Sequence, residues 1–182
     1  TKHFISGAEH ADFVIVFMAS GVEDTPRGPK KKITCFLVDR GMPGFEIKDG
    51  YKSVPHTGYK NSILTFDDCR LPNAKVLGEV HGGFKVMNEW LYATRLTVAA
   101  FCVGRARRVF DLATQWSAER HQFGQPIGKF QGVSFERADM ITEIDAAEWL
   151  PLAGAWRLDE GLEANREIAS AKLYASEMLA RV

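Results

Sequence analysis

The sequence has 182 residues, of which 46% are hydrophobic and 25% charged, a balance typical of a folded globular chain and not of a disordered or fibrous one. Lysine plus arginine equals aspartate plus glutamate at 23 each, and this zero formal net charge argues against nucleic acid or an anionic membrane as a partner of the whole surface. The longest uninterrupted apolar run, from Phe13 to Ala19, is far shorter than the roughly 20 residues that span a membrane.

The first 75 residues alternate short β-prone runs with turn-forming residues. Runs of β-branched and aromatic residues predict strands at 3–6, 13–18, 33–38, 45–48 and 62–66. Because no helical pattern of about 10 to 15 residues separates these runs, they favour an antiparallel sandwich or barrel over a Rossmann unit. Lys30, Lys31 and Lys32 follow a turn at 26–29, and we interpret them as a solvated hairpin tip, with phosphate binding as the alternative.

After Pro72, apolar residues recur every three or four positions, which predicts long amphipathic helices. The first helix should extend from about 83 to 118, the second from about 130 to 158 with Pro151 as an internal kink or break, and the third from about 162 onward. The residues expected to face inward are Phe84, Met87, Leu91, Thr94, Val98, Phe101, Cys102, Val109, Leu112, Trp116, Val133, Phe135, Ala138, Ile141, Ile144, Ala147, Ile168, Ala171, Leu173 and Ala175. A further set of small residues would let a neighbouring helix approach closely: Ala99, Ala100, Gly104 and Ala106.

Short connections between these helices predict antiparallel packing. The fold class is therefore α+β, an antiparallel β-barrel or sandwich segment followed by long antiparallel helices of a partial bundle. We place a β domain at residues 1–75 and an α-helical domain at 76–182.

The cysteines and the ends of the sequence carry further expectations. Cys35, Cys69 and Cys102 follow no metal-binding spacing and have apolar or β-branched neighbours, which predicts reduced, buried thiols in an intracellular compartment. The sequence starts at Thr1 without an initiator methionine and stops at Val182 inside a helical pattern. We therefore expect it to be part of a longer protein.

The connection between the first two helices combines three kinds of ligand-binding side chain. Arg120, Gln122 and Phe123 offer a cation, an amide and an aromatic ring within four residues, next to Gly124 and Pro126. Basic residues outnumber acidic ones by six to two between positions 95 and 130. These features indicate a binding site for an anionic ligand. The alternative is a solvated helix end, where the arginine would complement the helix dipole. Neither GxGxxG nor a Walker motif accompanies them.

Four segments together resemble the acyl-CoA dehydrogenase family. Arg120-x-x-Phe123-Gly124, with Gln131 further on, is similar to that family's RxxFG...Q segment. The other three segments are Phe4-Ile5-Ser6-Gly7 with Ala11-Asp12, Gly83-Phe84 leading to Leu91 and Thr94-Arg95, and Ala169-Ser170-Ala171-Lys172 with Ala175-Ser176-Glu177. The resemblance covers essentially the whole sequence. It implies the second half of the family's middle β domain and the first half of its four-helix C-terminal domain.

The resemblance also implies the chemistry. Members of this family bind FAD and dehydrogenate acyl-CoA thioesters, with a carboxylate that takes the α proton. They assemble as dimers or tetramers of identical subunits and pass electrons to an electron-accepting flavoprotein. The expected location is the cytoplasm, or the mitochondrial matrix in a eukaryote.

Site residues are carried over by position. Phe4, Ile5 and Ser6 would lie against the flavin ring, with the Ser6 hydroxyl replacing the family's threonine as a hydrogen-bond donor. Four residues of the connection would contact the FAD diphosphate and adenosine of a neighbouring subunit: Arg120, Gln122, Phe123 and Gln131. Tyr92 and Arg95 match positions that line the acyl-CoA site.

We assign no catalytic base within this sequence. The family's glutamate lies in most members in a later part of the C-terminal domain, and in some it precedes the helix arginine, where this sequence has Thr94. Glu89 is more than a helical turn away from that position. The alternatives are an acyl-CoA oxidase, a related flavin enzyme with a substrate other than a CoA thioester, and a non-catalytic interaction module. Alone, the 182 residues should not turn over substrate.

Overall fold

Each of the five β-prone runs forms a strand in the computed structural model, which describes residues 1–52, 58 and 60–182. The strands are β1 (Lys2–Ser6), β2 (Phe13–Thr25), β3 (Gly28–Asp39), β4 (Phe45–Tyr51) and β5 (Asn61–Phe66), joined by a short β6 (Val76–Leu77). β2 and β3 run past their predicted ends and pair as far as Thr25 and Gly28. The lysines at 30–32 are therefore paired residues of β3 next to the hairpin tip and do not form the tip itself.

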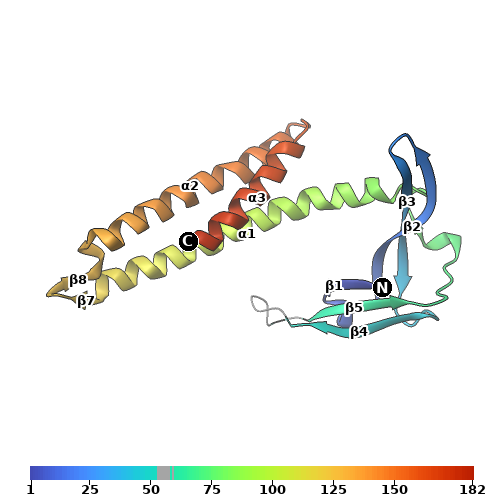
Figure 1. Cartoon of the computed structure of the whole chain (residues 1–182), viewed down its shortest axis with the longest axis horizontal. Helices are drawn as coiled ribbons and strands as arrows, with labels where there is room; N and C mark the ends of the chain where they lie inside the picture. Colours follow the sequence, from blue (N-terminus) through green and yellow to red (C-terminus); the bar gives the residue numbers. More distant parts are fainter. Residues whose placement is uncertain (53–57, 59) are drawn as a thin grey trace. The chain divides into compact units, whose positions relative to one another are not determined.

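The strands make two antiparallel three-stranded sheets, with the orders β1-β5-β4 and β2-β3-β6 (Figure 1). Side chains alternate along β2, so that Val14 and Val16 point inward whereas Ile15 is exposed. They share one core with Phe45 and Leu64 of the other sheet. This arrangement is sandwich-like, and the described strands do not close into a barrel.

Three long helices follow, close to the predicted ranges: α1 (Gly83–Glu119), α2 (Gln131–Asp159) and α3 (Asn165–Arg181). Gly161, with φ of 69°, follows α2, and α3 begins a few residues later than predicted. α2 continues through Pro151, so a break at that residue is excluded. Short 3-10 turns occupy Ala8–His10, Asn73–Lys75 and Ile127–Lys129. The sheets and helices confirm the α+β class.

The chain divides into two compact units, Thr1–Asn88 and Glu89–Val182. In the helical unit, α1 and α2 run antiparallel, with Nη2 of Arg107 3.0 Å from Oδ1 of Asp145. The division at residues 75 and 76 stays a prediction.

Small residues make the core of the helical unit. Its buried members are Ala99, Val103, Ala106, Ile144, Ala147, Ala171, Ala175 and Met178. Positions 99, 103 and 106 of α1 are spaced by four and three, which places Phe101 on the opposite side of the helix. The predicted inward direction is therefore wrong at eight positions, all of which are exposed: Phe84, Phe101, Val109, Leu112, Trp116, Phe135, Ala138 and Leu173. Ala100 and Gly104 are exposed as well.

Candidate functional site

The connection between α1 and α2 folds into a miniature hairpin, β7 (His121–Gln122) paired with β8 (Gln125–Pro126). Phe123 and Gly124 form its turn, with φ of 52° and 77°. Two positive φ angles are the signature of the type I′ turn, whose twist suits a two-residue hairpin. The backbone N–H of Ile127 donates to the carbonyl of Arg120 at 2.8 Å and closes the loop. The turn leaves the Phe123 side chain 92% exposed.

The structure brings the four predicted FAD contacts of this loop into one short segment. Arg120 directly follows α1, and its backbone N–H donates to the carbonyl of Trp116 at 2.8 Å. Its guanidinium forms no ion pair with any carboxylate of the described residues. Gln122 is exposed, and Gln131 is the exposed first residue of α2. The loop therefore presents a cation, two amides and an aromatic ring to solvent.

Buried groups beneath the loop are not apparent from the sequence. The Ser117 hydroxyl is buried and donates to the carbonyl of Thr114 at 2.8 Å. A Cβ atom on Gly128 would lie 3.1 Å from the carbonyl oxygen of Ser117, so glycine allows this close approach. Arg137 reaches the same place, with its guanidinium carbon 5.9 Å from the centre of the Phe110 ring. Only the glycine was a visible signal in the sequence.

Predicted flavin contacts of the other unit lie on β1, where the backbone is strained. Phe4 has φ of 58° at an irregularity in the pairing of β1 with β5, and its side chain is 65% exposed. A positive φ is unusual for a large side chain and occurs preferentially at functional sites. The Phe4 ring stacks on Tyr51 at 4.5 Å between centroids. The Ser6 hydroxyl donates to Oδ1 of Asn61 at 3.1 Å, and Ile5 packs against the core of the sheets.

Tyr92 and Arg95 lie three residues apart on α1, so they are neighbours on one helix face, and both are half-buried. The Tyr92 hydroxyl donates to Oδ1 of Asn165 at the start of α3. Asn165 was not a candidate, because 73 residues separate it from Tyr92 in the sequence. Thr94 donates its hydroxyl proton to the carbonyl of Trp90 at 3.0 Å and does not replace a catalytic carboxylate.

A cavity of about 370 Å³ lies beside the β2–β3 hairpin. The lysines at 30–32 line it together with His81 and Phe84. His81 is held in place, because its Nδ1 atom is 2.9 Å from the Ser20 hydroxyl and its backbone N–H donates to the Thr34 hydroxyl at 2.7 Å. The lining is predominantly basic and suits an anionic group.

Part of the predicted charge asymmetry in the helical unit is neutralised internally. Arg107 pairs with Glu148 and Asp145, and these carboxylates raise the pKa of its guanidinium.

The three cysteines differ in burial. Burial raises the pKa of the Cys35 thiol, as expected of an unreactive core cysteine, while Cys69 and Cys102 are only partly buried.

Two absences hold for the parts of the chain that the structure describes. No cluster of metal-ligating side chains occurs there. None of the helices described has both the length and the apolar character of a membrane-spanning segment.

Comparison with protein families gives two successive matches, separated by residues 70–80. The family model of the acyl-CoA dehydrogenase middle domain matches residues 1–69, and that of the acyl-CoA dehydrogenase C-terminal domain matches residues 81–182. Together they cover nearly the whole chain and confirm the resemblance seen in its four sequence segments.

Individual relatives agree with the family models. The probable acyl-CoA dehydrogenase YngJ of Bacillus subtilis is 36% identical over 99% of this chain and 47% of its own length. A subunit of the caffeyl-CoA reductase–Etf complex of Acetobacterium woodii is 32% identical over 97% of this chain and 46% of its own length. The solved structure of butyryl-CoA dehydrogenase from Megasphaera elsdenii superposes with a TM-score of 0.85 at 36% identity, over 97% of this chain and 45% of that one. The chain thus spans about half the length of the curated relatives that it matches.

Proposed function

The chain belongs to the acyl-CoA dehydrogenase family, and from that premise we propose that the whole protein is an FAD-dependent oxidoreductase that acts between the α and β carbons of an acyl-CoA thioester. The observation that carries the proposal is the exposed loop between α1 and α2. Its turn holds an aromatic residue in a left-handed conformation with the ring in solvent, next to an arginine without a carboxylate partner among the described residues. A protein that only needed to connect two helices would require neither feature.

The side chains of this loop fit an FAD molecule bound by a neighbouring subunit. The Arg120 guanidinium suits the diphosphate, because it offers paired donors to phosphate oxygens. Phe123 offers a stacking surface for the adenine, and Gln122 and Gln131 offer amides for polar groups of the adenosine. We assign Phe4, Ile5 and Ser6 to the flavin ring. When bound, FAD would supply the acceptor for the hydride that leaves the β carbon.

For the acyl-CoA substrate we assign Tyr92 and Arg95 to the wall of its site. Separately, in the other unit, the cavity lined by Lys30, Lys31, Lys32 and His81, with Glu23 as its acidic member, suits an anionic group such as a phosphate. The α proton of a thioester is weakly acidic, so hydrogen bonds to the thioester carbonyl must stabilise the charge that develops there. We assign the general base to a carboxylate of the whole protein outside these 182 residues.

The same proposal includes the partners. Identical subunits, as a dimer or a tetramer, would complete the FAD site, and the exposed apolar residues of α1 and α2 are compatible with such burial. An electron-accepting flavoprotein would reoxidise the enzyme, in the cytoplasm or in the mitochondrial matrix of a eukaryote. The relative from Acetobacterium woodii is named as a subunit of a caffeyl-CoA reductase–Etf complex. Its name describes a reduction, which is the opposite direction of the reaction proposed here.

The test uses the purified full-length protein under anaerobic conditions. A series of saturated acyl-CoA thioesters should bleach the bound flavin, whereas the matching free acids should not, because the CoA moiety supplies remote binding energy for positioning. Equal bleaching by the free acids would instead indicate a substrate other than a CoA thioester. If oxygen is then admitted and rapidly reoxidises the bleached flavin, the protein is an oxidase. A colourless protein that takes up no FAD would indicate an interaction module.

A further inference from the structure

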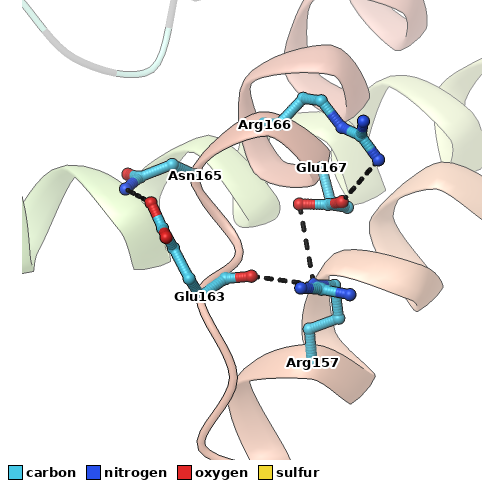
Figure 2. Close-up of polar contacts among 5 residues, drawn as sticks. All are labelled: Arg157, Glu163, Asn165, Arg166 and Glu167. Atoms are coloured by element: carbon cyan, nitrogen blue, oxygen red, sulfur yellow. Dashed lines mark hydrogen bonds and ion pairs between the residues drawn. The ribbon is translucent and has the colours of Figure 1, made fainter.

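A polar cluster organises the turn between α2 and α3 (Figure 2). Arg157, in the last part of α2, donates from Nε to the backbone carbonyl of Glu163 at 2.8 Å. The same Nε lies 3.7 Å from a carboxylate oxygen of Glu167, in the first turn of α3. Glu167 also pairs with Arg166 at 3.0 Å. The arginine at the end of one helix thus fixes both the turn and the start of the next helix.

Asn165 is the member of this cluster that reaches out of the turn. Its Nδ2 atom donates to Oε1 of Glu163 at 3.1 Å, and its Oδ1 atom accepts the hydroxyl proton of Tyr92. The two contacts use opposite ends of one amide. Because a carboxylate can only accept, it fixes which end of the amide faces Glu163 and leaves the oxygen for Tyr92.

Hydrogen bonds, and not packing, hold the Asn165 side chain. The residue is exposed, and it lines a cavity of about 380 Å³ together with Arg157, Glu163, Arg166 and Glu167. The orientation of the amide therefore depends on Glu163, whose backbone is in turn held by Arg157.

The far end of this chain of contacts is Tyr92, on the helix face of α1 that also carries Arg95. The Tyr92 phenol donates its only proton to Asn165, and this hydrogen bond restrains the tyrosine side chain. We propose that Asn165 is a positioning residue for the acyl-CoA site: it acts through Tyr92, and the α2–α3 turn thereby helps to set which acyl groups the site accepts. This inference rests on the proposed function, since it takes Tyr92 as a wall of the substrate site.

The experiment compares four variants of the full-length holoenzyme: Asn165→Ala, Tyr92→Phe, the double variant, and Arg166→Ala as the matched control. Arg166 is adjacent in the sequence and exposed, and among the described residues its ion pair is with Glu167 alone. KM and kcat are measured for a series of acyl-CoA thioesters that differ in length and branching. Melting temperatures are measured for all variants.

In Asn165→Ala we expect KM to rise about three- to tenfold for the preferred thioester, the size of one lost hydrogen bond, with kcat within about twofold. The order of preference among acyl groups should flatten. Tyr92→Phe should give the same shift, and the double variant should add nothing to either single change. Arg166→Ala should leave KM and acyl preference unchanged.

The experiment distinguishes a failure of this inference from a failure of the proposed function. If the unmodified enzyme turns over acyl-CoA but Asn165→Ala lowers only the melting temperature and leaves every KM ratio unchanged, the residue is structural and the inference is wrong. Additive effects of the two single changes would overturn it as well. If no acyl-CoA bleaches the unmodified protein, the proposed function itself fails, and the inference fails with it.

Discussion

Replacing Phe123 by glycine separates the backbone strain of the loop from its function. An L-residue in the left-handed region costs about 1–2 kcal/mol, which glycine at φ of 52° would recover. Against this, the extra freedom of glycine in the unfolded chain costs about 0.5–1 kcal/mol. The edge-to-face contact with Phe130, 6.1 Å between centroids, is lost and removes about 0.5–1.5 kcal/mol. These contributions nearly cancel, so the free energy of unfolding should change by less than about 1 kcal/mol.

FAD affinity should respond differently. If the Phe123 ring stacks on the adenine, its loss removes about 1–3 kcal/mol, which raises the Kd of FAD roughly 5- to 150-fold. Arg120→Ala should weaken binding by more than about tenfold, because a charge-assisted contact to phosphate contributes about 1.5–3 kcal/mol. Phe123→Leu is the control that keeps the left-handed strain and an apolar side chain but removes the ring.

Both quantities are measured on the full-length protein, the unfolding free energy by denaturant titration of the apoprotein and the Kd by flavin fluorescence. Phe123→Gly and Phe123→Leu should lose FAD affinity alike, and only the leucine variant should retain the strain. A glycine variant that is destabilised by more than about 2 kcal/mol, with an unchanged Kd, would refute the reasoning and make Phe123 a structural residue.

Two further predictions concern stability. Gly83→Ala would place a Cβ atom 2.8 Å from the backbone nitrogen of Cys35 and should destabilise the protein by about 1–3 kcal/mol. At Gly104 an added Cβ atom meets nothing within 4 Å, so Gly104→Ala should stabilise α1 by up to about 1 kcal/mol. Equal denaturant midpoints for the two variants would contradict this prediction. The pKa of the Glu167 carboxyl is lowered in the folded protein, chiefly by the backbone N–H of the same residue and by Arg157 and Arg166. The ionised carboxylate therefore stabilises the fold at pH values above the ordinary pKa of 4.5. This stabilisation is lost as the pH falls through the folded-state pKa. Urea midpoints measured between about pH 5 and about pH 3 should therefore fall less steeply in Glu167→Gln than in the unmodified protein, and parallel slopes would exclude this role.

Local sequence patterns were sufficient for the five longer strands and the three long helices, but not for the two-residue strands β6, β7 and β8. The five strands and three helices follow from β-prone runs and from helical periodicity, because both signals lie within a few neighbouring residues. The buried face of α1 could not be found in the same way. Large apolar residues such as Phe101 and Trp116 are exposed, whereas Ala99 and Ala106 are buried in the core of the helical unit, because burial depends on where the partner helices pack.

In the candidate site, too, features within one short segment were predictable and contacts between distant segments were not. The loop from Arg120 to Gln131 is continuous in sequence, so its clustering was predictable, although the left-handed turn at Phe123 was not. Contacts between distant segments were missed: Tyr51 under Phe4, and Asn165 on Tyr92. Each depends on how two elements come together, and a single sequence carries no local signal for that.

All four tryptophans of the sequence lie in the helical unit, so tryptophan fluorescence reports on that unit. Trp90, Trp116, Trp149 and Trp156 all lie on α1 or α2, and each is between 57% and 72% exposed. Tryptophan emission should therefore be red-shifted and open to quenching by iodide, and under excitation selective for tryptophan the sheets, which contain none, should not contribute. Assembly into the full protein should shift the emission to the blue wherever a partner surface covers an indole. Unfolding followed by fluorescence would report on the helices alone, and its midpoint could be compared with that of circular dichroism to show whether both units unfold together.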